Sequence, residues 1–254
     1  MEYKSLFIFI SIVFFGVLET ICPFFQYRQG AIKIFSTNLI LGLINAIGIN
    51  LLIALILKWV WKQTIWLGLF DAINIPWLEF SLSFFLLDLY MYVWHRLMHS
   101  SSLGWNFHLV HHTDRYINIS TAYRFHIIEV ILSNLPKIFL IYLFGIEINN
   151  LIFYESLFAI SLIFHHSNLA LNFQIDKFVS YLIVTPNYHR FHHSQMIEAT
   201  NSNYSSLLTI WDVIFQSRYY PLFPETIKLG VAQENRDFNF IQLLKLPFMA
   251  RNRE

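Results

Sequence analysis

The sequence predicts an all-α integral membrane protein, in which about four to five apolar segments form a helical bundle and a histidine-rich helical cap covers one end. Its 254 residues are 56% hydrophobic and only 13% charged, whereas soluble domains average about 25% charged residues. All eleven histidines fall between His95 and His193. The histidines are therefore confined to one part of a largely apolar chain.

The net charge and the cysteine content exclude several classes of function. A formal net charge of +1 gives no reason to expect nucleic acid as a partner. Cys22 is the only cysteine. The chain therefore cannot form an internal disulfide, a thiolate zinc site or a cysteine-ligated iron-sulfur cluster.

The first two apolar runs predict an N-terminal transmembrane hairpin within residues 1–75. Residues 6–25 approach the roughly 20 residues that cross hydrocarbon. No small-x-small cleavage site follows them, so we expect a retained helix rather than a signal peptide. Residues 39–57 contain no charged side chain and give the clearest membrane helix of the sequence.

Three further apolar segments, residues 76–94, 127–144 and 148–164, each contain ionisable side chains. Because charges at membrane depth are expensive, we expect these segments to face the protein interior or to lie near an interface, and some of them to be re-entrant. Gly145 and Glu147 predict a tight turn that joins the last two segments into a hairpin.

Two polar, histidine-bearing blocks flank this hairpin, at about residues 95–126 and 165–193. Because a hairpin returns to the side from which it started, both blocks should emerge on the same side of the membrane. Positive residues concentrate on the cytoplasmic side of membrane proteins. The residues that indicate a cytoplasmic face here are Arg96, Arg115, Arg124, Lys177, Arg190 and Arg218.

The histidines form three clusters with helical spacing. One H-x-x-x-H (residues 95–99) and two H-x-x-H-H stretches (108–112 and 189–193) each place several rings on one helix face. Buried imidazoles without partners lose hydration and would repel one another if protonated. A bound cation removes both difficulties by taking each neutral nitrogen as a ligand. The clustering therefore predicts metal binding.

The number of imidazoles favours two metal ions over one. A catalytic zinc needs about three protein ligands, and the three clusters supply at least eight histidines. Imidazole suits iron, zinc and copper alike, so the ligand type does not name the element. A single-zinc membrane hydrolase and a histidine-rich metal transporter remain alternatives, and a transporter would distribute its ligands along a path through the bilayer.

The sequence around these clusters resembles the fatty acid hydroxylase/sterol desaturase superfamily, whose members carry an H-x3-H, H-x2-H-H, H-x2-H-H series of histidine boxes. The resemblance extends in order from residue 88 to residue 215. The matching stretches are DLYMYVWHRLMH (88–99), WNFHLVHH (105–112), NISTAYRFHIIE (118–129), FHHSN (164–168), VTPNYHRFHHS (184–194), NY (203–204) and WDVIF (211–215).

This resemblance implies a membrane-bound di-iron oxidoreductase that uses O2 to hydroxylate or desaturate a C–H bond of a lipid, such as a fatty acyl chain or a sterol. It makes residues 76–220 the catalytic region and residues 221–254 a C-terminal tail. The metal ligands that it implies are His95, His99, His108, His111, His112, His166, His189, His192 and His193, with His126 as a further candidate.

Four polar residues are expected to support the ligands: Asp88, Asn168, Arg124 and Asp212. Asp88 lies two turns before His95 on the same helical face, so it either accepts a ring N–H from the metal site or pairs with an arginine. His165 is expected either to pack beside the ligands or to support one of them.

The resemblance also implies two iron ions as cofactors, which zinc can replace, and O2 as co-substrate. Oxygen activation consumes electrons, and the chain has no iron-sulfur cysteines and no G-x-G-x-x-G loop, so a separate reductase or small electron carrier is expected. The other expected partners are the membrane and a lipid substrate, with hydroxylation favoured over desaturation.

Overall fold

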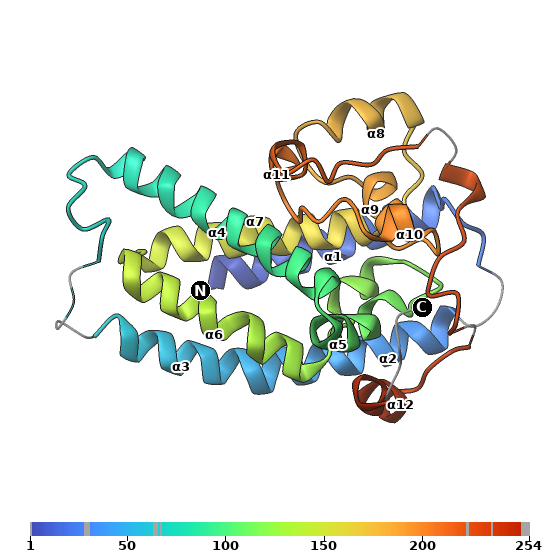
Figure 1. Ribbon diagram of the computed structural model, residues 1–254, viewed down its shortest axis with the longest axis horizontal. Coiled ribbons are helices and arrows are strands. Elements are labelled where there is room, and N and C mark those ends of the chain that lie inside the picture. Colours follow the sequence, from blue (N-terminus) through green and yellow to red (C-terminus); the bar gives the residue numbers. More distant parts are fainter. Residues whose placement is uncertain are drawn as a thin grey trace.

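The computed structural model describes residues 2–27, 31–62, 66, 68–221, 224–234 and 236–249. Within these ranges the structure is all-helical, with long helices in a bundle and a cap of short helices at one end (Figure 1). The predicted fold class, an integral membrane helical bundle, is confirmed. Residues 250–254 of the predicted tail lie outside the described residues.

The bundle is built from the long helices of the chain. These are α1 (Glu2–Ile21), α2 (Ala31–Ile44), a π-helical turn (Asn45–Ile49), α3 (Asn50–Val60), α4 (Pro76–Ser100), α6 (Ile127–Phe144) and α7 (Ile148–His166). Their outer surface is apolar: Phe9, Leu51 and Phe139 are 63%, 62% and 60% exposed. Such a surface suits lipid, since water would strongly disfavour contiguous apolar patches of this size.

Four helical stretches of the described residues are long and apolar enough to cross a membrane: Lys4–Ile21, Ile32–Val60, Ile127–Phe144 and Ile148–His166. The second stretch joins α2 and α3 through the π-helical turn. The predicted segment at residues 76–94 becomes part of α4, which is not among the four. Polar and charged side chains such as Glu79 and Asp88 lower its hydropathy, although its 25 residues extend over about 37 Å.

The turn between α6 and α7 lies at the end of the bundle away from the cap. Gly145 ends α6 with φ +70°, a left-handed conformation that favours glycine. Glu147 then occupies the N-cap position of α7. Figure 1 shows α6 and α7 running from this turn toward the cap.

The cap is made of short helices that follow or separate the long ones. They are α5 (Ser102–His112), a 3-10 helix (Ile119–Tyr123), α8 (Phe173–Val179), α9 (Pro186–His192), α10 (Ile197–Thr200), α11 (Ile210–Ile214) and α12 (Phe240–Lys245). The interior of the cap is rich in buried polar side chains, including fully buried Arg124, Arg190 and Asp212. A buried polar group is tolerated only with a hydrogen-bonding partner or a ligand.

Candidate metal centre

The candidate ligands come from four helices whose ends meet in the cap. His95 and His99 lie on the last turns of α4, and α5 carries the histidines of the second cluster. His166 is the last residue of α7, and α9 carries His189 and His192 with His193 as its C-cap. Helical spacing aims the rings within each cluster, while helix packing brings the clusters together.

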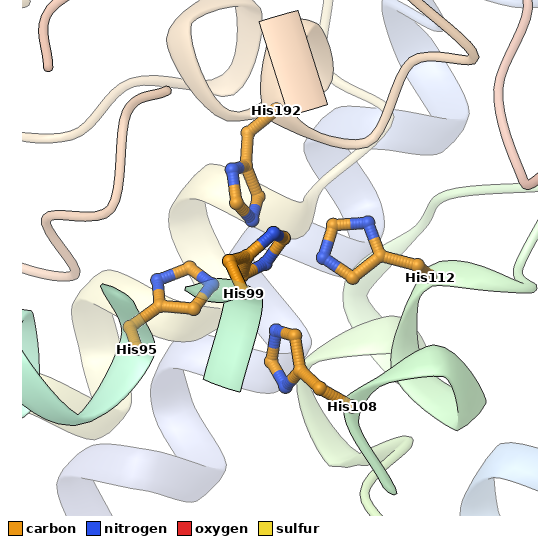
Figure 2. A group of neighbouring side chains, drawn as sticks. All are labelled: His95, His99, His108, His112 and His192. Atoms are coloured by element: carbon orange, nitrogen blue, oxygen red, sulfur yellow. The ribbon is translucent and has the colours of Figure 1, made fainter. Parts of the chain in front are cut away.

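The structure divides the histidines into two groups. In the first, one ring nitrogen from each of five histidines lies within 4.8 Å of every other, and all five residues are buried. Figure 2 shows these rings turned toward a common centre. The members of this group, here called group A, are His95, His99, His108, His112 and His192.

The second group, here called group B, consists of His111, His166, His189 and His193. The Nε2 atom of His166 lies 3.1 Å from Nε2 of His111 and 3.0 Å from Nε2 of His189. Nε2 of His193 lies 3.1 Å from Nε2 of His189. Neighbouring ligands at right angles, each about 2.1 Å from a metal, have nitrogens about 3.0 Å apart, so these spacings fit a coordination shell.

Groups A and B are adjacent because two of the clusters contribute to both. His112 of group A and His193 of group B stack with ring centroids 4.4 Å apart. The neighbouring rings of His108 and His111 have centroids 5.2 Å apart. Two metal ions bound by these groups would therefore be close neighbours.

Hydrogen bonds from the Nδ1 atoms to acceptor oxygens set the orientation of three rings in group A. Nδ1 of His95 lies 2.7 Å from the carbonyl oxygen of Tyr204, and Nδ1 of His192 lies 2.7 Å from that of Ser202. Nδ1 of His108 lies 2.6 Å from Oε1 of Glu129. With the proton on Nδ1, each Nε2 keeps a lone pair for a metal.

The remaining ring nitrogens provide a test of whether a metal fits. Nε2 of His95, His108, His112 and His192 is buried and has no hydrogen-bond partner among the described residues. A buried imidazole nitrogen without a partner is costly. All four of these atoms belong to group A, so a cation at its centre would satisfy them together.

Burial also favours the neutral form of several histidines in the two groups. It lowers the pKa of His95, His111 and His112 well below its usual value, and the neighbouring imidazoles lower it further. Burial likewise lowers the pKa of His192 to about 3. Imidazole binds metals in its neutral form, so the site is prepared for a metal at neutral pH.

Two histidines of this region lie outside both groups. His126 is the N-cap of α6, where its Nδ1 accepts from the N–H of Ile128 at 3.1 Å, and its Nε2 lies 3.3 Å from the carbonyl oxygen of Leu244. The structure therefore does not bring the tenth candidate ligand to the others. His165 packs against His189 with ring centroids 4.2 Å apart, as expected of a packing residue.

Asp88 adopts neither of the two arrangements that the sequence suggested. Its Oδ2 accepts from Nε1 of Trp211 at 2.8 Å and from the N–H of Leu208 at 3.3 Å, so it fixes the segment before α11. Seven residues of helix separate Asp88 from His95 by about 10 Å. This separation is too long for a direct hydrogen bond to the ring.

Glu129 makes the hydrogen bond to a histidine ring that was expected of Asp88. It was not predicted from the sequence as a supporting residue. It is the first-turn acid of α6, 3% exposed, and it bonds the ring of His108. The signal in the sequence was an ionisable side chain near the start of an apolar run. The sequence did not show that Glu129 pairs with His108, because the two residues are 21 positions apart.

Arg124 and Asp212 act on the ligands through the backbone. Arg124 donates from Nε to the carbonyl oxygen of Val110 at 2.8 Å and from Nη2 to Oγ1 of Thr113 at 2.9 Å, which fixes the end of α5. Asp212 accepts from the N–H of Tyr204 at 2.9 Å and so positions the carbonyl that orients His95. Both therefore hold ligand-bearing segments.

Asn168 is further from the chemistry than the sequence suggested. Its side chain bonds both the N–H and the carbonyl oxygen of Phe25, at 3.0 Å and 2.9 Å, and its backbone N–H donates to Glu19 at 2.8 Å. Asn168 thus fastens the segment after α1 to the end of α7, immediately beyond His166.

A cavity of about 330 Å³ adjoins the histidines. His95, His108 and His111 line it at the cap, and the space then runs between α1, α4, α6 and α7. Apolar side chains such as Phe158 and Leu162 form much of its wall. A cavity of this size with apolar walls and a few polar groups is typical of a small-molecule site.

Fold and site together define an integral membrane helical protein whose cap holds two adjacent groups of buried histidines, arranged as metal ligands. Residues 80–217 match the model of the fatty acid hydroxylase family. The chain belongs to this family.

Several proteins with named activities are similar to this chain. The ornithine lipid hydroxylase of Rhizobium tropici is 27% identical over 169 residues, which are 65% of this chain and 48% of that protein. The alkylglycerol monooxygenase of Danio rerio is 30% identical over 156 residues, 58% of this chain and 32% of that protein. A very-long-chain aldehyde decarbonylase of Oryza sativa subsp. japonica is 28% identical over 137 residues, 50% of this chain and 22% of that protein.

The matched region thus spans about half or less of each of these relatives. No solved structure gives a significant match.

Proposed function

We propose that this protein is a membrane-bound di-iron oxidoreductase that uses O2 to hydroxylate a C–H bond of a lipid. The observation that carries the proposal is the placement of two adjacent imidazole groups at the end of a cavity inside a membrane bundle. The names of the relatives, a lipid hydroxylase and an alkylglycerol monooxygenase, support hydroxylation over desaturation.

Groups A and B would each hold one iron ion through neutral imidazole nitrogens. Bound there, the two ions would supply the redox chemistry for O2-dependent attack on a C–H bond. Zinc can occupy the same ligands but brings no redox chemistry.

The side chains around the groups prepare the site before any substrate arrives. Glu129 and the carbonyl oxygens of Tyr204 and Ser202 hold three rings in one tautomer and orientation. The apolar cavity walls exclude water and guide a hydrocarbon chain toward His95 and His108. Such preorganisation keeps the reacting carbon near the metals and limits side reactions.

The geometry favours this proposal over the two alternatives. A single catalytic zinc uses about three protein ligands, whereas groups A and B together contain nine histidines. A transporter would distribute its ligands along a path across the bilayer, whereas here both groups lie together where α4 and α7 end beside α5 and α9.

We place the histidine cap at the cytoplasmic face, where a separate reductase or electron carrier would deliver electrons. Arg96, Arg115, Lys177 and Arg218 support this orientation. Arg124 and Arg190 do not count toward it, because both are fully buried.

A single added thiol tests the orientation. In a variant in which Cys22→Ser removes the native thiol, Gln174→Cys on exposed α8 should react with an impermeant thiol reagent only in inside-out vesicles. Labelling in right-side-out vesicles would place the cap on the other face.

The test of the function is metal and oxygen stoichiometry. Protein purified in lipid nanodiscs should contain about two iron ions per chain. With a chemical reductant and ¹⁸O2, it should insert labelled oxygen into a co-purified or added lipid, detected by mass spectrometry. One zinc per chain together with activity in the absence of O2 would instead identify a hydrolase.

A further inference from the structure

Three charged side chains from three helices meet at the wall of the cavity, away from the histidines. Nζ of Lys137 on α6 lies 2.7 Å from Oε1 of Glu155 on α7. Nζ of Lys4 on α1 lies 3.7 Å from Oε2 of the same carboxylate. The three side chains are 14%, 23% and 31% exposed for Lys137, Glu155 and Lys4 respectively. We call this cluster the ionic triad.

The ionic triad and the histidines line the same cavity. Glu155 precedes His166 on α7 by eleven positions, which is about 16 Å of helix. Lys137 follows Glu129 on α6 by eight positions, about 12 Å of helix. The triad therefore lies well down the cavity from the candidate metal ligands, between apolar walls.

The triad has an excess of positive charge. It contains two ammonium groups and one carboxylate. Among the described residues that line the cavity, the other acid is Glu129, which is hydrogen-bonded to His108. Ionisable residues inside membrane-spanning helices are expensive and usually mark a functional site. One ion pair would need only one lysine, so the second is unexplained by a purely structural role.

The surroundings of the triad suit a single hydrocarbon chain. The cavity of about 330 Å³ is at the small end of the range of ligand sites, which favours one chain over two. Its walls between triad and histidines include Ile8, Phe158 and Leu162. A chain with a polar head at the triad would thus pass along apolar side chains to the histidines.

We propose that the ionic triad binds the anionic headgroup of the substrate, a single-chain amphiphile whose hydrocarbon chain runs through the cavity to groups A and B. The inference rests on the proposed function, since it names the substrate class of that site. It also places the oxidised carbon far along the chain, about 12 to 16 Å from the head. A carboxylate and a phosphate share the required charge.

Binding to metal-free protein tests the proposal without any need for turnover. The probes are palmitate, the neutral hexadecanol of equal chain length, and 1-palmitoyl lysophosphatidate, measured by equilibrium binding to the full chain in nanodiscs. The variants are Lys137→Met, Lys137→Arg and Glu155→Gln. Lys58→Met is the matched control, because Lys58 is an exposed lysine of another membrane helix, α3.

If the triad binds anions through its charge, removing the charge of Lys137 and removing that of Glu155 should change the affinity for anionic probes in opposite directions. Lys137→Met should weaken binding of the anionic probes about tenfold, or about 1.4 kcal/mol, and leave hexadecanol unchanged. Lys137→Arg should retain anion binding, and Glu155→Gln should strengthen it. Lys58→Met should change nothing. Tighter, Lys137-dependent binding of either palmitate or lysophosphatidate identifies the carboxylate or the phosphate as the preferred head.

A purely structural ion pair predicts a different pattern. Both Lys137→Met and Glu155→Gln would then weaken binding of all three probes alike, and this result would overturn the proposal. Equal affinity of the wild-type protein for hexadecanol and for both anionic probes would also overturn it.

The same variants separate this inference from the proposed function. If anion binding depends on Lys137 but iron-loaded protein oxidises no lipid, the oxidoreductase proposal fails and the binding site stands. If iron-loaded protein oxidises lipids with the same head preference in wild type and Lys137→Met, the oxidoreductase stands and the headgroup site is wrong.

Discussion

The membrane bundle and the histidine cap bury their side chains in opposite ways. The bundle presents apolar residues such as Leu51 and Phe139 to the outside, and its helices are held mainly by close packing. The cap instead buries histidines, Arg124 and Asp212, each of which needs a partner. The bundle should therefore tolerate loss of single side chains, whereas the cap depends on complete polar networks.

The largest effect on stability should follow from breaking such a network in the cap. Arg124→Met would remove the guanidinium donor to Oδ1 of Asn38 and to Oγ1 of Thr113, and it would leave the carbonyl oxygen of Val110 with the Thr113 hydroxyl as its side-chain donor. Removing one partner of a buried charged network costs about 3 to 5 kcal/mol. We expect a loss of this size in the free energy of unfolding of the metal-free protein, measured by denaturant titration in detergent.

The lipid-facing side of the bundle provides the control for this substitution. Leu51→Ala removes a side chain that is 62% exposed and should change the free energy of unfolding by no more than about 0.5 kcal/mol. Equal losses for Arg124→Met and Leu51→Ala would contradict the contrast between cap and bundle.

Loss of one ligand should have the next largest effect. His111→Ala removes one candidate ligand of group B. The control, His126→Asn, changes a histidine outside both groups and keeps a side chain that can cap α6. We expect His111→Ala to lose bound iron and at least about 100-fold in turnover, since even loss of a residue that only orients a ligand costs 10- to 100-fold. His126→Asn should keep its iron.

Iron analysis and product formation measured on the same samples check this result. A His111→Ala protein that keeps both its metal content and its turnover would refute the assignment of group B.

Metal removal should destabilise the cap and leave the bundle unchanged. A ligand at 100 times its dissociation constant stabilises the folded state by about 2.7 kcal/mol. Because groups A and B join α4, α5, α7 and α9, hydrogen exchange after chelation should rise in α5 and α9. It should stay unchanged in α3, which contributes no ligand. A uniform rise over both regions would show that the metals do not act through the cap.

The smallest effect is expected at Glu129. Glu129→Gln keeps an oxygen near Nδ1 of His108 but removes the charge, so iron affinity should fall about tenfold. Glu79→Gln is the matched control: Glu79 bonds Asn150 at 3.0 Å, away from the histidines. Metal titration of both variants checks the prediction, and equal affinities would leave Glu129 without a role at the metal site.

Much of the fold could be predicted because its helices have clear local signals in the sequence. Continuous apolar runs and the glycine at position 145 predicted the membrane helices and their turn, and the structure has both. The segment at residues 76–94 was harder to judge. Its apolar residues predict a helix, but its acids find partners such as Asn150 and Trp211 only through packing.

The candidate site divides in the same way. Helical periodicity indicated that His108, His111 and His112 project together, and every predicted ligand except His126 lies in group A or group B. Periodicity could not show that His111 joins a different group from its neighbours. Nor could it show that Glu129, rather than Asp88, bonds a ligand.

The class of fold, the family and the candidate metal ligands other than His126 could be predicted from the sequence alone, because composition, periodicity and motif order are properties of a linear chain. Tertiary packing was needed to show which imidazoles share a centre, that Glu129 orients His108, and that Lys4, Lys137 and Glu155 line the same cavity. These pairings join residues far apart in sequence. Their geometry is set by how the helices pack, which no local pattern encodes.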